Sequence, residues 1–353
     1  MRPEILSVNI SETCNNACTF CLTRYRQPGT AKMMDWDTYV KILEQAEELG
    51  CRFLQLHGLN EMFTNPRAID MVEEATKRGF RLWMYTNATL LNKEIIKRLS
   101  RRSIWRLSVS VYGFDRESYI QNARTDNFDK MYNNILEIFE QFSTPESIEY
   151  TENTNIVLSF LNIPILVDNA HIIMEKFGNL VSNFNAKKGK IIGDKILDNV
   201  FRRSGRARIE WNILEDSVEP RLHQEPENKN YLFHGYGCKE RSTGSKCEHS
   251  CARIAFDCMV YPNGDVCYCC SNMDHEGVLG NIHVTSLRRC WESDYAESLR
   301  RLFFNGQKHL VPLCSHCALG PPKSNFTSFY NMRNSIFKID DEWYAHKYRT
   351  MDL

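Results

Sequence analysis

Cysteine is the residue type through which this chain can do the most chemistry, and its fourteen copies are unevenly placed. Cys14, Cys18 and Cys21 lie in one short segment near the start of the chain, and ten more lie between Cys238 and Cys317. Cytosolic thiols stay reduced, so clustered cysteines in a chain without an export signal are more often metal ligands than disulfides. The distribution therefore predicts two metal-bearing regions separated by a cysteine-poor body.

The N-terminal group has the spacing CxxxCxxC, and the aromatic Phe20 precedes its last cysteine. Three thiolates in one loop can hold three irons of a cubane iron–sulfur cluster and leave the fourth iron open to a substrate or cosubstrate. Half of a zinc site, or three buried thiols, is the competing interpretation. Zinc requires a fourth ligand at short spacing, and no His or Cys follows Cys21 until Cys51. The spacing therefore favours the iron–sulfur cluster.

The C-terminal group combines the spacing Cys-x12-Gly-x4-Cys, from Cys251 to Cys269, with a CxxC formed by Cys314 and Cys317. Residues 259–266 contain a Pro-Asn-Gly turn, which predicts a hairpin whose second strand ends near Cys269. A hairpin followed by a distant CxxC can bind zinc as well as an iron–sulfur cluster. Taken alone, this group leaves both metals open.

The elements that must position these cysteines follow from the periodicity of residues 5 to about 200. Short β-branched or apolar runs alternate there with longer amphipathic segments. The predicted strands cover residues 5–10, 51–56, 80–85, 104–111 and 156–160, and the predicted helices cover residues 35–49, 66–77, 93–101, 131–142 and 171–177. Repeated strand–helix units predict an α/β fold with a parallel sheet, closed into a full or partial barrel by right-handed crossovers. Chemistry then belongs at the carboxyl ends of the strands, where the first cysteine motif lies.

The charge balance excludes several classes of function. The chain has 44 Lys and Arg against 44 Asp and Glu, a net charge of zero, whereas general nucleic-acid and anionic-membrane binders carry a basic surplus. Residues 189–211 contain four arginines, which in a neutral chain favours a solvated or substrate-lining segment over a nucleic-acid patch. No run is apolar enough to span a membrane, and the N-terminus lacks the form of a signal peptide. We therefore expect a cytoplasmic protein with no nucleic-acid and no membrane partner.

The first cysteine motif, CxxxCx(aromatic)C after the first predicted strand, resembles that of radical S-adenosylmethionine (SAM) enzymes. Residues 57–62, His-Gly-Leu-Asn-Glu-Met, are similar to the Gly-Gly-Glu-Pro motif of that family, with an Asn for Gly and a Met for Pro. Thr-Asn-Ala at residues 86–88 is similar to its Thr-Asn-Gly, and residues 108–113 are similar to the segment whose serine contacts SAM. The resemblance covers residues 5 to 165 and implies a partial (β/α)6 TIM-like barrel.

The resemblance also implies cofactors and roles. Cys14, Cys18 and Cys21 would ligate a 4Fe-4S cluster whose open iron chelates SAM. The residues that it implies in SAM binding are Phe20, Gly58, Asn60, Glu61, Asn87, Ser110 and Arg124. A carboxylate suits the SAM ammonium group, and the planar fork of an arginine suits the SAM carboxylate. Reductive cleavage of SAM then gives a 5′-deoxyadenosyl radical that abstracts a substrate hydrogen, with electrons from a flavodoxin- or ferredoxin-type donor.

The C-terminal cysteines resemble the SPASM or twitch domain that many radical SAM enzymes carry. The resemblance implies a second 4Fe-4S cluster, the auxiliary cluster, with the ligands Cys251, Cys269, Cys314 and Cys317. Their spacings are similar to those of radical SAM dehydrogenases that oxidise an aminocyclitol. The implied domains are a barrel over residues 1–200, a connecting segment over 201–245, the auxiliary-cluster domain over 246–322, and a C-terminal helix and tail over 323–353. The other seven cysteines are expected to be small buried apolar residues or, for one of them, a hydrogen-atom donor.

Together these features predict a radical SAM oxidoreductase that oxidises or epimerises a polar small molecule of the sugar or aminocyclitol type. An auxiliary cluster with four protein ligands has no open iron, which favours a role in electron transfer. The alternative is a peptide- or protein-modifying maturase, which the start of the barrel at residue 5 disfavours, because no leader-peptide recognition domain precedes it. A non-catalytic scaffold that binds zinc or nucleic acid is a third interpretation. The sequence assigns no catalytic base.

Anaerobic reconstitution is expected to give about eight irons and eight sulfides per chain, from two cubane clusters. Replacing Cys14, Cys18 and Cys21 together by Ala removes one cluster and should halve both contents, which chemical iron and sulfide analysis measures. The cluster that remains cannot cleave SAM. A triple variant that still forms 5′-deoxyadenosine would contradict the assignment of these cysteines.

Overall fold

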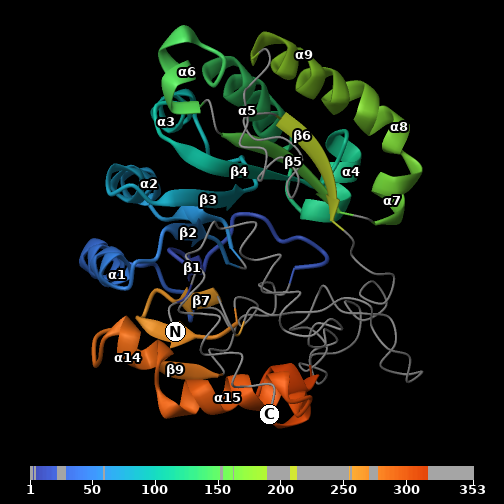
Figure 1. Ribbon diagram of the computed structural model, residues 1–353. Helices are drawn as coiled ribbons and strands as arrows, with labels where there is room; N and C mark the ends of the chain where they lie inside the picture. Colours follow the sequence, from blue (N-terminus) through green and yellow to red (C-terminus); the bar gives the residue numbers. More distant parts are fainter. Residues whose placement is uncertain are drawn as a thin grey trace.

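A computed structural model of the protein describes residues 3, 5–21, 29–58, 60–151, 154–161, 163–188, 207–212, 254, 257–269 and 277–316 (Figure 1). Its centre is one nine-stranded sheet in the order β6-β5-β4-β3-β2-β1-β7-β8-β9. The first six strands carry the helices of the barrel, and the last three extend the same sheet beyond β1. No helix in the described part of the chain is long and apolar enough to cross a bilayer.

Six strands form the partial barrel, and each pairs in parallel with its neighbours. Their bounds are β1 (Ile5–Val8), β2 (Phe53–Leu56), β3 (Arg81–Thr86), β4 (Ile104–Val111), β5 (Asn155–Leu161) and β6 (Ala207–Asn212). The helices between them are α1 (Trp36–Glu48), α2 (Ala68–Lys77), α3 (Lys93–Leu99), α4 (Arg116–Ala123), α5 (Phe128–Gln141), α6 (Pro145–Thr151), α7 (Pro164–Asp168), α8 (Ala170–Ile173) and α9 (Asn179–Lys188). This arrangement confirms the predicted α/β fold with a parallel sheet.

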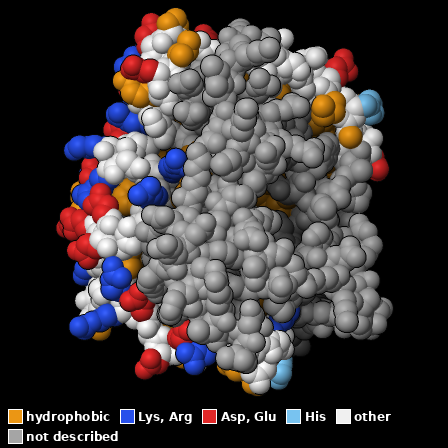
Figure 2. All heavy atoms as spheres, viewed as in Figure 1, with side chains coloured by type: hydrophobic (Ala, Val, Ile, Leu, Met, Phe, Trp, Pro, Cys, Tyr) orange, Lys and Arg blue, Asp and Glu red, His pale blue; other side chains and the backbone are white. Residues whose placement is uncertain are grey.

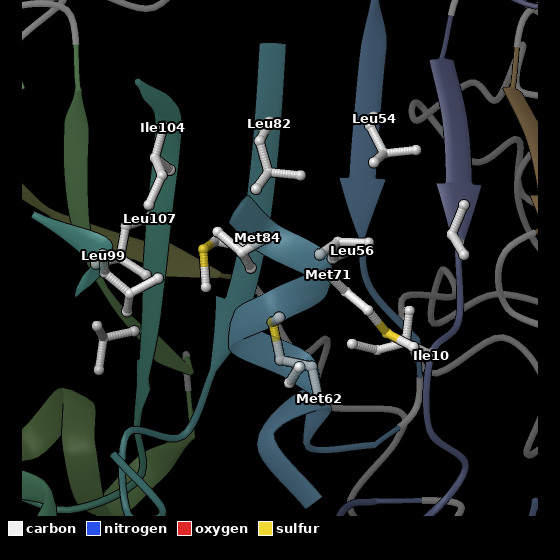
Figure 3. Close-up of a cluster of buried hydrophobic side chains, with 14 of the residues drawn as sticks. Ile10, Leu54, Leu56, Met62, Met71, Leu82, Met84, Leu99, Ile104 and Leu107 are labelled. Atoms are coloured by element: carbon white, nitrogen blue, oxygen red, sulfur yellow. The ribbon is translucent and has the colours of Figure 1, made fainter. Parts of the chain in front are cut away.

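Alternate side chains of each strand point to opposite faces of the sheet. The face beneath the helices is apolar and buried, and Figure 3 shows part of this core: Leu54, Leu82, Met84, Leu107 and, from α2, Met71. The opposite face lies inside the barrel, and we refer to it as the concave face. It carries polar and aromatic residues, among them Ser7, Gln55, Trp83, Tyr85 and Arg106. The barrel therefore has a dry outer core and a chemically versatile interior.

Elements that the sequence analysis did not predict include β6 and α4. β6 lies in the segment that was expected to connect the two domains, so the parallel sheet continues beyond residue 200. α4 has no apolar stripe, because its buried residues include Ser118 and Asn122. A capping box defines its start instead: Asp115 Oδ1 accepts a hydrogen bond from the backbone N–H of Ser118, and Ser118 Oγ accepts one from the backbone N–H of Asp115.

The C-terminal segment adds three short strands and two helices. They are β7 (Asp257–Val260), β8 (Asp265–Cys267), β9 (Val278–Asn281), α14 (Leu287–Trp291) and α15 (Asp294–Phe304). β7 and β8 form the hairpin that the Pro-Asn-Gly turn predicts. Gly264 closes this turn in the left-handed region, at φ +85°, and its N–H donates to the carbonyl of Tyr261 at 2.9 Å.

β7 also pairs in parallel with β1, which joins the C-terminal segment to the barrel. Ser7 Oγ donates to Asp257 Oδ1 at 2.7 Å, and both residues are buried. Nearby, the backbone N–H of Leu287 in α14 donates to Oε1 of Gln45 in α1 at 2.5 Å. Ser7 and Asp257 are 250 positions apart, so nothing in the local sequence indicates that their strands are neighbours.

Ser7→Ala should lower the free energy of unfolding by about 1–3 kcal/mol, because the buried carboxylate of Asp257 then loses a donor that water cannot replace. Urea denaturation followed by circular dichroism measures the change. Ser298→Ala is a matched control, since Ser298 Oγ donates to the carbonyl of Tyr295 at an exposed position; its effect should stay below about 0.5 kcal/mol. Equal effects of the two substitutions would show that Ser7 does not secure β7 to the barrel.

Candidate active site

The first three cysteines lie in the loop that leaves the carboxyl end of β1, and we call this segment, residues 9–21, the cysteine loop. Cys18 is buried, and Cys14 and Cys21 are half-buried. Burial raises the pKa of Cys14 to about 12 and that of Cys18 well above its usual value, and the neighbouring cysteines raise both further. The backbone N–H of Asn16, 3.5 Å from Cys14 Sγ, acts in the opposite direction. Such thiols ionise readily only when a metal compensates their charge, so the loop fits a metal cluster.

That Cys14, Cys18 and Cys21 share one metal centre stays a prediction. Among the described residues, no three His, Cys, Asp or Glu side chains come close enough together to hold one metal ion. In a cubane cluster each thiolate binds a different iron, whereas a zinc site brings its ligands to a single ion.

The carboxyl end of α4 holds the cysteine loop in place. The backbone N–H of Ala17 donates to the carbonyl of Ala123 at 3.0 Å, and Asn16 Nδ2 donates to the hydroxyl of Tyr119 at 3.0 Å. Arg124 comes directly after Ala123, ends the helix in the left-handed region at φ 58°, and has an exposed side chain. The helix that the sequence analysis missed is thus the element that brings Arg124 beside the cysteine loop.

Glu61 is the buried carboxylate of the site, with 1% of its surface exposed. Its Oε1 accepts hydrogen bonds from Thr86 Oγ1 at 2.8 Å and from the backbone N–H of Phe63 at 3.2 Å. Its Oε2 accepts one from the backbone N–H of Asn87 at 2.5 Å. Burial raises the pKa of Glu61 to about 7, although these hydrogen bonds lower it. All three donors are neutral, so a cationic ligand such as an ammonium group would stabilise the ionised form.

Asn87 links the loop after β3 to the cysteine loop. Its Nδ2 donates to Asn15 Oδ1 at 3.0 Å and lies 3.9 Å from Cys14 Sγ. Ala88 stands where the related motif has Gly, and it adopts the left-handed conformation at φ 61° that Gly usually supplies. The structure thus brings Cys14, Asn87 and Glu61 together from the loops that follow three different strands.

Gly58 and Asn60 shape the loop after β2. A Cβ atom on Gly58 would lie 2.6 Å from Asn60 Nδ2 and 2.8 Å from Asn9 Cγ, so a larger residue would require both asparagine side chains to shift. Asn60 Nδ2 donates to Asn9 Oδ1 and to the carbonyl of Ser11. The side chain of Asn60 therefore ties this loop to the cysteine loop, and a contact between Asn60 and SAM stays a prediction.

Phe20 and Ser110 meet at Tyr112, which follows β4. The rings of Phe20 and Tyr112 have centroids 5.2 Å apart, and burial raises the pKa of Tyr112 well above its usual value, an effect that the side chain of Ser110 opposes. All three residues are half-buried. Ser110 is therefore available on the concave face close to the cysteine loop, as its predicted role requires.

Half-buried aromatic residues continue along the concave face toward the other end of the strands. The ring of His57 lies 5.3 Å from that of Tyr85, and Tyr85 stacks on Trp83 with centroids 5.5 Å apart. The sequence analysis did not select these residues. A usable signal lies in residues 81–86, where Trp and Tyr, which carry polar atoms, alternate with Leu and Met.

Two of the four expected auxiliary-cluster ligands, Cys269 and Cys314, lie among the described residues. Both are half-buried and pack against one apolar cluster that contains Tyr268. Burial is the main cause that raises the pKa of Tyr268, and both cysteines raise it further. Cys251 and Cys317 lie outside the described residues. Cys269 and Cys314 thus lie in one neighbourhood, as ligands of a shared cluster must.

The two cysteine groups lie toward opposite ends of β1. β8 runs antiparallel to β7 and pairs Cys267 with Met259, so Cys269, two residues further on, lies toward the N-terminal end of β7. Because β7 is parallel to β1, this is also the N-terminal end of β1. The loop with Cys14 leaves the opposite end, and the concave face extends between the two groups.

Four of the remaining cysteines are buried thiols with at most 5% of their surface exposed: Cys51, Cys258, Cys267 and Cys290. Burial raises the pKa of Cys258 well above its usual value and that of Cys290 to about 11, which keeps both protonated. They are the small buried residues that the sequence analysis expects. Cys238, Cys247 and Cys270 lie outside the described residues.

Comparison with known families agrees with the geometry. Residues 8–151 match the radical SAM superfamily, and residues 251–318 match the SPASM iron–sulfur cluster-binding domain. The two matched domains define an iron–sulfur enzyme built on a partial α/β barrel. More specifically, the chain carries a radical SAM domain followed by a SPASM domain. Its cofactors are SAM, a 4Fe-4S cluster in the radical SAM domain and auxiliary iron–sulfur cluster content in the SPASM domain.

Curated relatives match only part of the chain. A tungsten-containing aldehyde ferredoxin oxidoreductase cofactor-modifying protein of Pyrococcus furiosus is 35% identical over 102 residues, 29% of this chain and 28% of that protein. An AdoMet-dependent heme synthase of Methanosarcina barkeri is 28% identical over 126 residues, 36% of this chain and 34% of that protein. The chain thus aligns with about a third of the length of these relatives.

Solved structures match nearly all of the chain at low identity. BtrN in complex with AdoMet and 2-DOIA has a TM-score of 0.54 at 15% identity and covers 92% of this chain and 98% of its own. Native anSMEcpe with bound AdoMet has a TM-score of 0.55 at 13% identity, with coverages of 94% and 96%. SuiB of Streptococcus suis bound to precursor peptide SuiA has a TM-score of 0.52 at 15% identity, with coverages of 90% and 72%. At such identities the likeness establishes the fold alone.

Glu61→Gln should change the pH dependence of the stability of the cluster-free protein. The pKa of Glu61 is about 7 in the folded chain and 4.5 in its ordinary state, so this carboxyl group stabilises the fold at low pH and loses that contribution as the pH rises through 7. The unfolding free energy of the wild type, relative to that of Glu61→Gln, should therefore fall by up to about 3 kcal/mol between pH 5 and pH 8. Urea unfolding at a series of pH values measures it. A difference that does not vary with pH would show that burial does not perturb Glu61.

Proposed function

We propose that this protein oxidises or epimerises a polar small molecule of the sugar or aminocyclitol type after abstracting a hydrogen atom from it. The observation that carries the proposal is that the two cysteine groups lie toward opposite ends of β1, with the concave face between them. A substrate on that face has the site of SAM cleavage at one side and the auxiliary cluster at the other. This suits a reaction that removes a hydrogen atom and then an electron.

Different residues of the chain hold the cluster and SAM. Cys14, Cys18 and Cys21 would hold three irons of the first cluster, and Glu61 and Arg124 would bind the ammonium and carboxylate groups of SAM. When bound, this cluster and SAM would supply the power to abstract a hydrogen atom, with the electron coming from a flavodoxin- or ferredoxin-type donor. The barrel orients the substrate C–H bond and keeps water away from the reacting atoms.

The character of the concave face supports a hydroxylated small molecule as substrate. His57, Tyr85 and Ser110 offer hydrogen-bonding groups there and are half-buried, so part of each side chain remains accessible. Such groups match hydroxyl or amine substituents. A carbon can become a carbonyl by losing a hydrogen atom only if it carries a substituent of this kind. The likeness of the fold to BtrN in complex with 2-DOIA agrees with this substrate class.

A peptide- or protein-modifying maturase is the second candidate. It is favoured by the likeness of the fold to SuiB bound to precursor peptide SuiA and to anSMEcpe with bound Kp18Cys peptide. These neighbours are 15% and 13% identical to this chain, so they support the alternative through the fold alone.

A panel of labelled compounds separates the two candidates. Anaerobically reconstituted holoenzyme is incubated with SAM, a reductant and either C–H-deuterated sugars and aminocyclitols or deuterated peptides, and 5′-deoxyadenosine is analysed by mass spectrometry. Deuterium transfer from a sugar or aminocyclitol supports the proposal. Transfer from peptides alone supports the maturase, and a protein that forms no 5′-deoxyadenosine with any compound contradicts both.

Cys314→Ala combined with Cys317→Ala tests the need for the auxiliary cluster, because it removes two proposed ligands and leaves the N-terminal cysteines intact. In a net oxidation, formation of 5′-deoxyadenosine should stay within about threefold of the wild type, a change below about 1 kcal/mol in the barrier. Oxidised product should fall much further, because the electron acceptor is lost. Chromatographic assay of both compounds, with circular dichroism of the variant, measures this uncoupling.

Cys51→Ala is the matched control, since Cys51 is a buried thiol that belongs to neither cysteine group. It should keep both activities. Full product from the double variant would mean that the reaction is redox-neutral, as an epimerisation is. A double variant that does not fold would mean that the cluster serves chiefly to stabilise the domain.

A further inference from the structure

One row of side chains crosses the concave face at the third residue of each of β1 to β4 and the first residue of β5. Strand register aligns Ser7, Gln55, Trp83, Arg106 and Asn155 as successive neighbours on β1 to β5. Four of them are polar and buried, with exposed fractions of 0%, 2%, 7% and 4% for Ser7, Gln55, Arg106 and Asn155. We call this row the barrel floor. If this row only filled the inside of the barrel, we would expect it to be apolar, as the cores of closed barrels are.

Arg106 is the cation of the barrel floor. Its Nε donates to Ser108 Oγ at 2.8 Å, and its guanidinium carbon lies 4.6 Å from the centroid of the Trp83 ring. A guanidinium group has five N–H donors in a planar fork, a geometry that matches carboxylate and phosphate groups. This cation–π contact with Trp83 restricts the movement of the guanidinium group, which favours bidentate recognition of an oxyanion.

A break in strand register places Trp83 beside Arg106. The pairing of β3 with β4 shifts after Leu82, so that Trp83 pairs with Arg106 and Trp105 is an extra residue on β4. The ring of Trp105 contacts those of Trp83 and Phe53 edge-on, at centroid distances of 5.9 and 5.7 Å. Bulges of this kind redirect side chains and are common beside active sites.

Two buried polar atoms of the barrel floor are unpaired within the described part of the chain. Nε1 of Trp83 and Oδ1 of Asn155 have no hydrogen-bond partner there, although Asn155 Nδ2 donates to the carbonyl of Trp105 at 3.2 Å. Buried polar atoms left unpaired are rare, because each costs free energy. These two belong to the register neighbours of Arg106 on either side: one is a donor, suited to an anion, and the other is an acceptor, suited to a hydroxyl group.

The barrel floor and the SAM motifs are separated by a distance that suits a small molecule. Arg106 and Ser110 are four residues apart on β4, which corresponds to ~13 Å along a strand. Half-buried Trp83, Tyr85 and His57 line the concave face between them. A small molecule held at the floor by one end can therefore extend its other end toward the cysteine loop.

We propose that Arg106 and Trp83 bind an oxyanion of the substrate and that Asn155 accepts a hydrogen bond from a neighbouring hydroxyl group. The substrate is then a hydroxylated small molecule that carries a carboxylate or a phosphate, such as a sugar acid or a sugar phosphate. That the ligand of this site is the substrate rests on the proposed function, whereas the binding site itself does not.

Three probes of similar size test the site: glycerol 3-phosphate, glycerate and glycerol, which carry a phosphate, a carboxylate and no anion. Their dissociation constants for the SAM-saturated holoenzyme are measured by isothermal titration calorimetry at constant ionic strength. At least one anionic probe should bind about tenfold or more tightly than glycerol, as expected for a charge-assisted hydrogen bond. The tighter of the two anions distinguishes phosphate from carboxylate.

Substitutions then test whether the preference for anionic probes comes from the barrel floor. Arg106→Met should weaken the anionic probe by about 10- to 150-fold and leave glycerol unchanged. Trp83→Phe, which keeps an aromatic ring and removes the indole N–H together with the pyrrole ring, should weaken it by about tenfold. Arg81→Met is the matched control, because Arg81 stacks over Phe53 at 5.5 Å but has an exposed side chain; it should bind all probes as the wild type does.

The proposal is overturned by a wild type that binds glycerol as tightly as both anions, or by a folded Arg106→Met variant with unchanged anion affinity. If Arg106→Met does not fold, Trp83→Phe and Arg106→Lys decide, and unchanged affinity in both overturns it equally. Formation of 5′-deoxyadenosine is assayed separately. Anion binding in a protein that cannot cleave SAM would overturn the proposed function and leave the binding site standing.

Discussion

The double pairing of β1 is the interaction on which the rest of this structure depends. β1 has four residues, all buried, and forms parallel ladders with β2 on one side and β7 on the other. One ladder, continued by the pairing of β2 with β3, aligns the carboxyl ends of β1, β2 and β3, so that Cys14, Glu61 and Asn87 meet. The other fixes the auxiliary hairpin along the whole of β1, with Cys269 toward the opposite end of this strand. Both proposed metal centres thus take their positions from a single short element.

Without its cofactors, the site holds ionisable groups in surroundings that disfavour their charged forms. Burial raises the pKa of Cys14 to about 12 and that of Glu61 to about 7, so neither group ionises as readily as it would in water. Iron supplies positive charge to the thiolates, and an ammonium group supplies it to the carboxylate. Binding of the cluster and of SAM would therefore relieve an unfavourable arrangement that the protein has already built, which couples cofactor binding to stability.

The sequence was sufficient for the parts of the fold that carry strong local patterns. The strand–helix alternation, the CxxxCxFC loop and the Pro-Asn-Gly hairpin all have such patterns, and all are present. α4 escaped prediction because its buried face is largely polar, with Ser118 and Asn122. The contact of β7 with β1 escaped because parallel neighbours so distant in sequence leave no local trace. The barrel floor escaped because its register depends on a bulge that no single strand reveals.

The shared sheet also makes the barrel depend on the C-terminal segment to cover the edge of β1. With β7 in place, β1 is an internal strand, and its backbone N–H and C=O groups are paired on both sides. Taking away the C-terminal segment would turn this apolar strand into an open edge, the kind of surface on which other chains add strands and aggregate. The auxiliary domain therefore acts as a protective cover for the barrel sheet, independently of any redox role. Selection that keeps the barrel soluble would preserve this hairpin even in a descendant that no longer needed its cysteines.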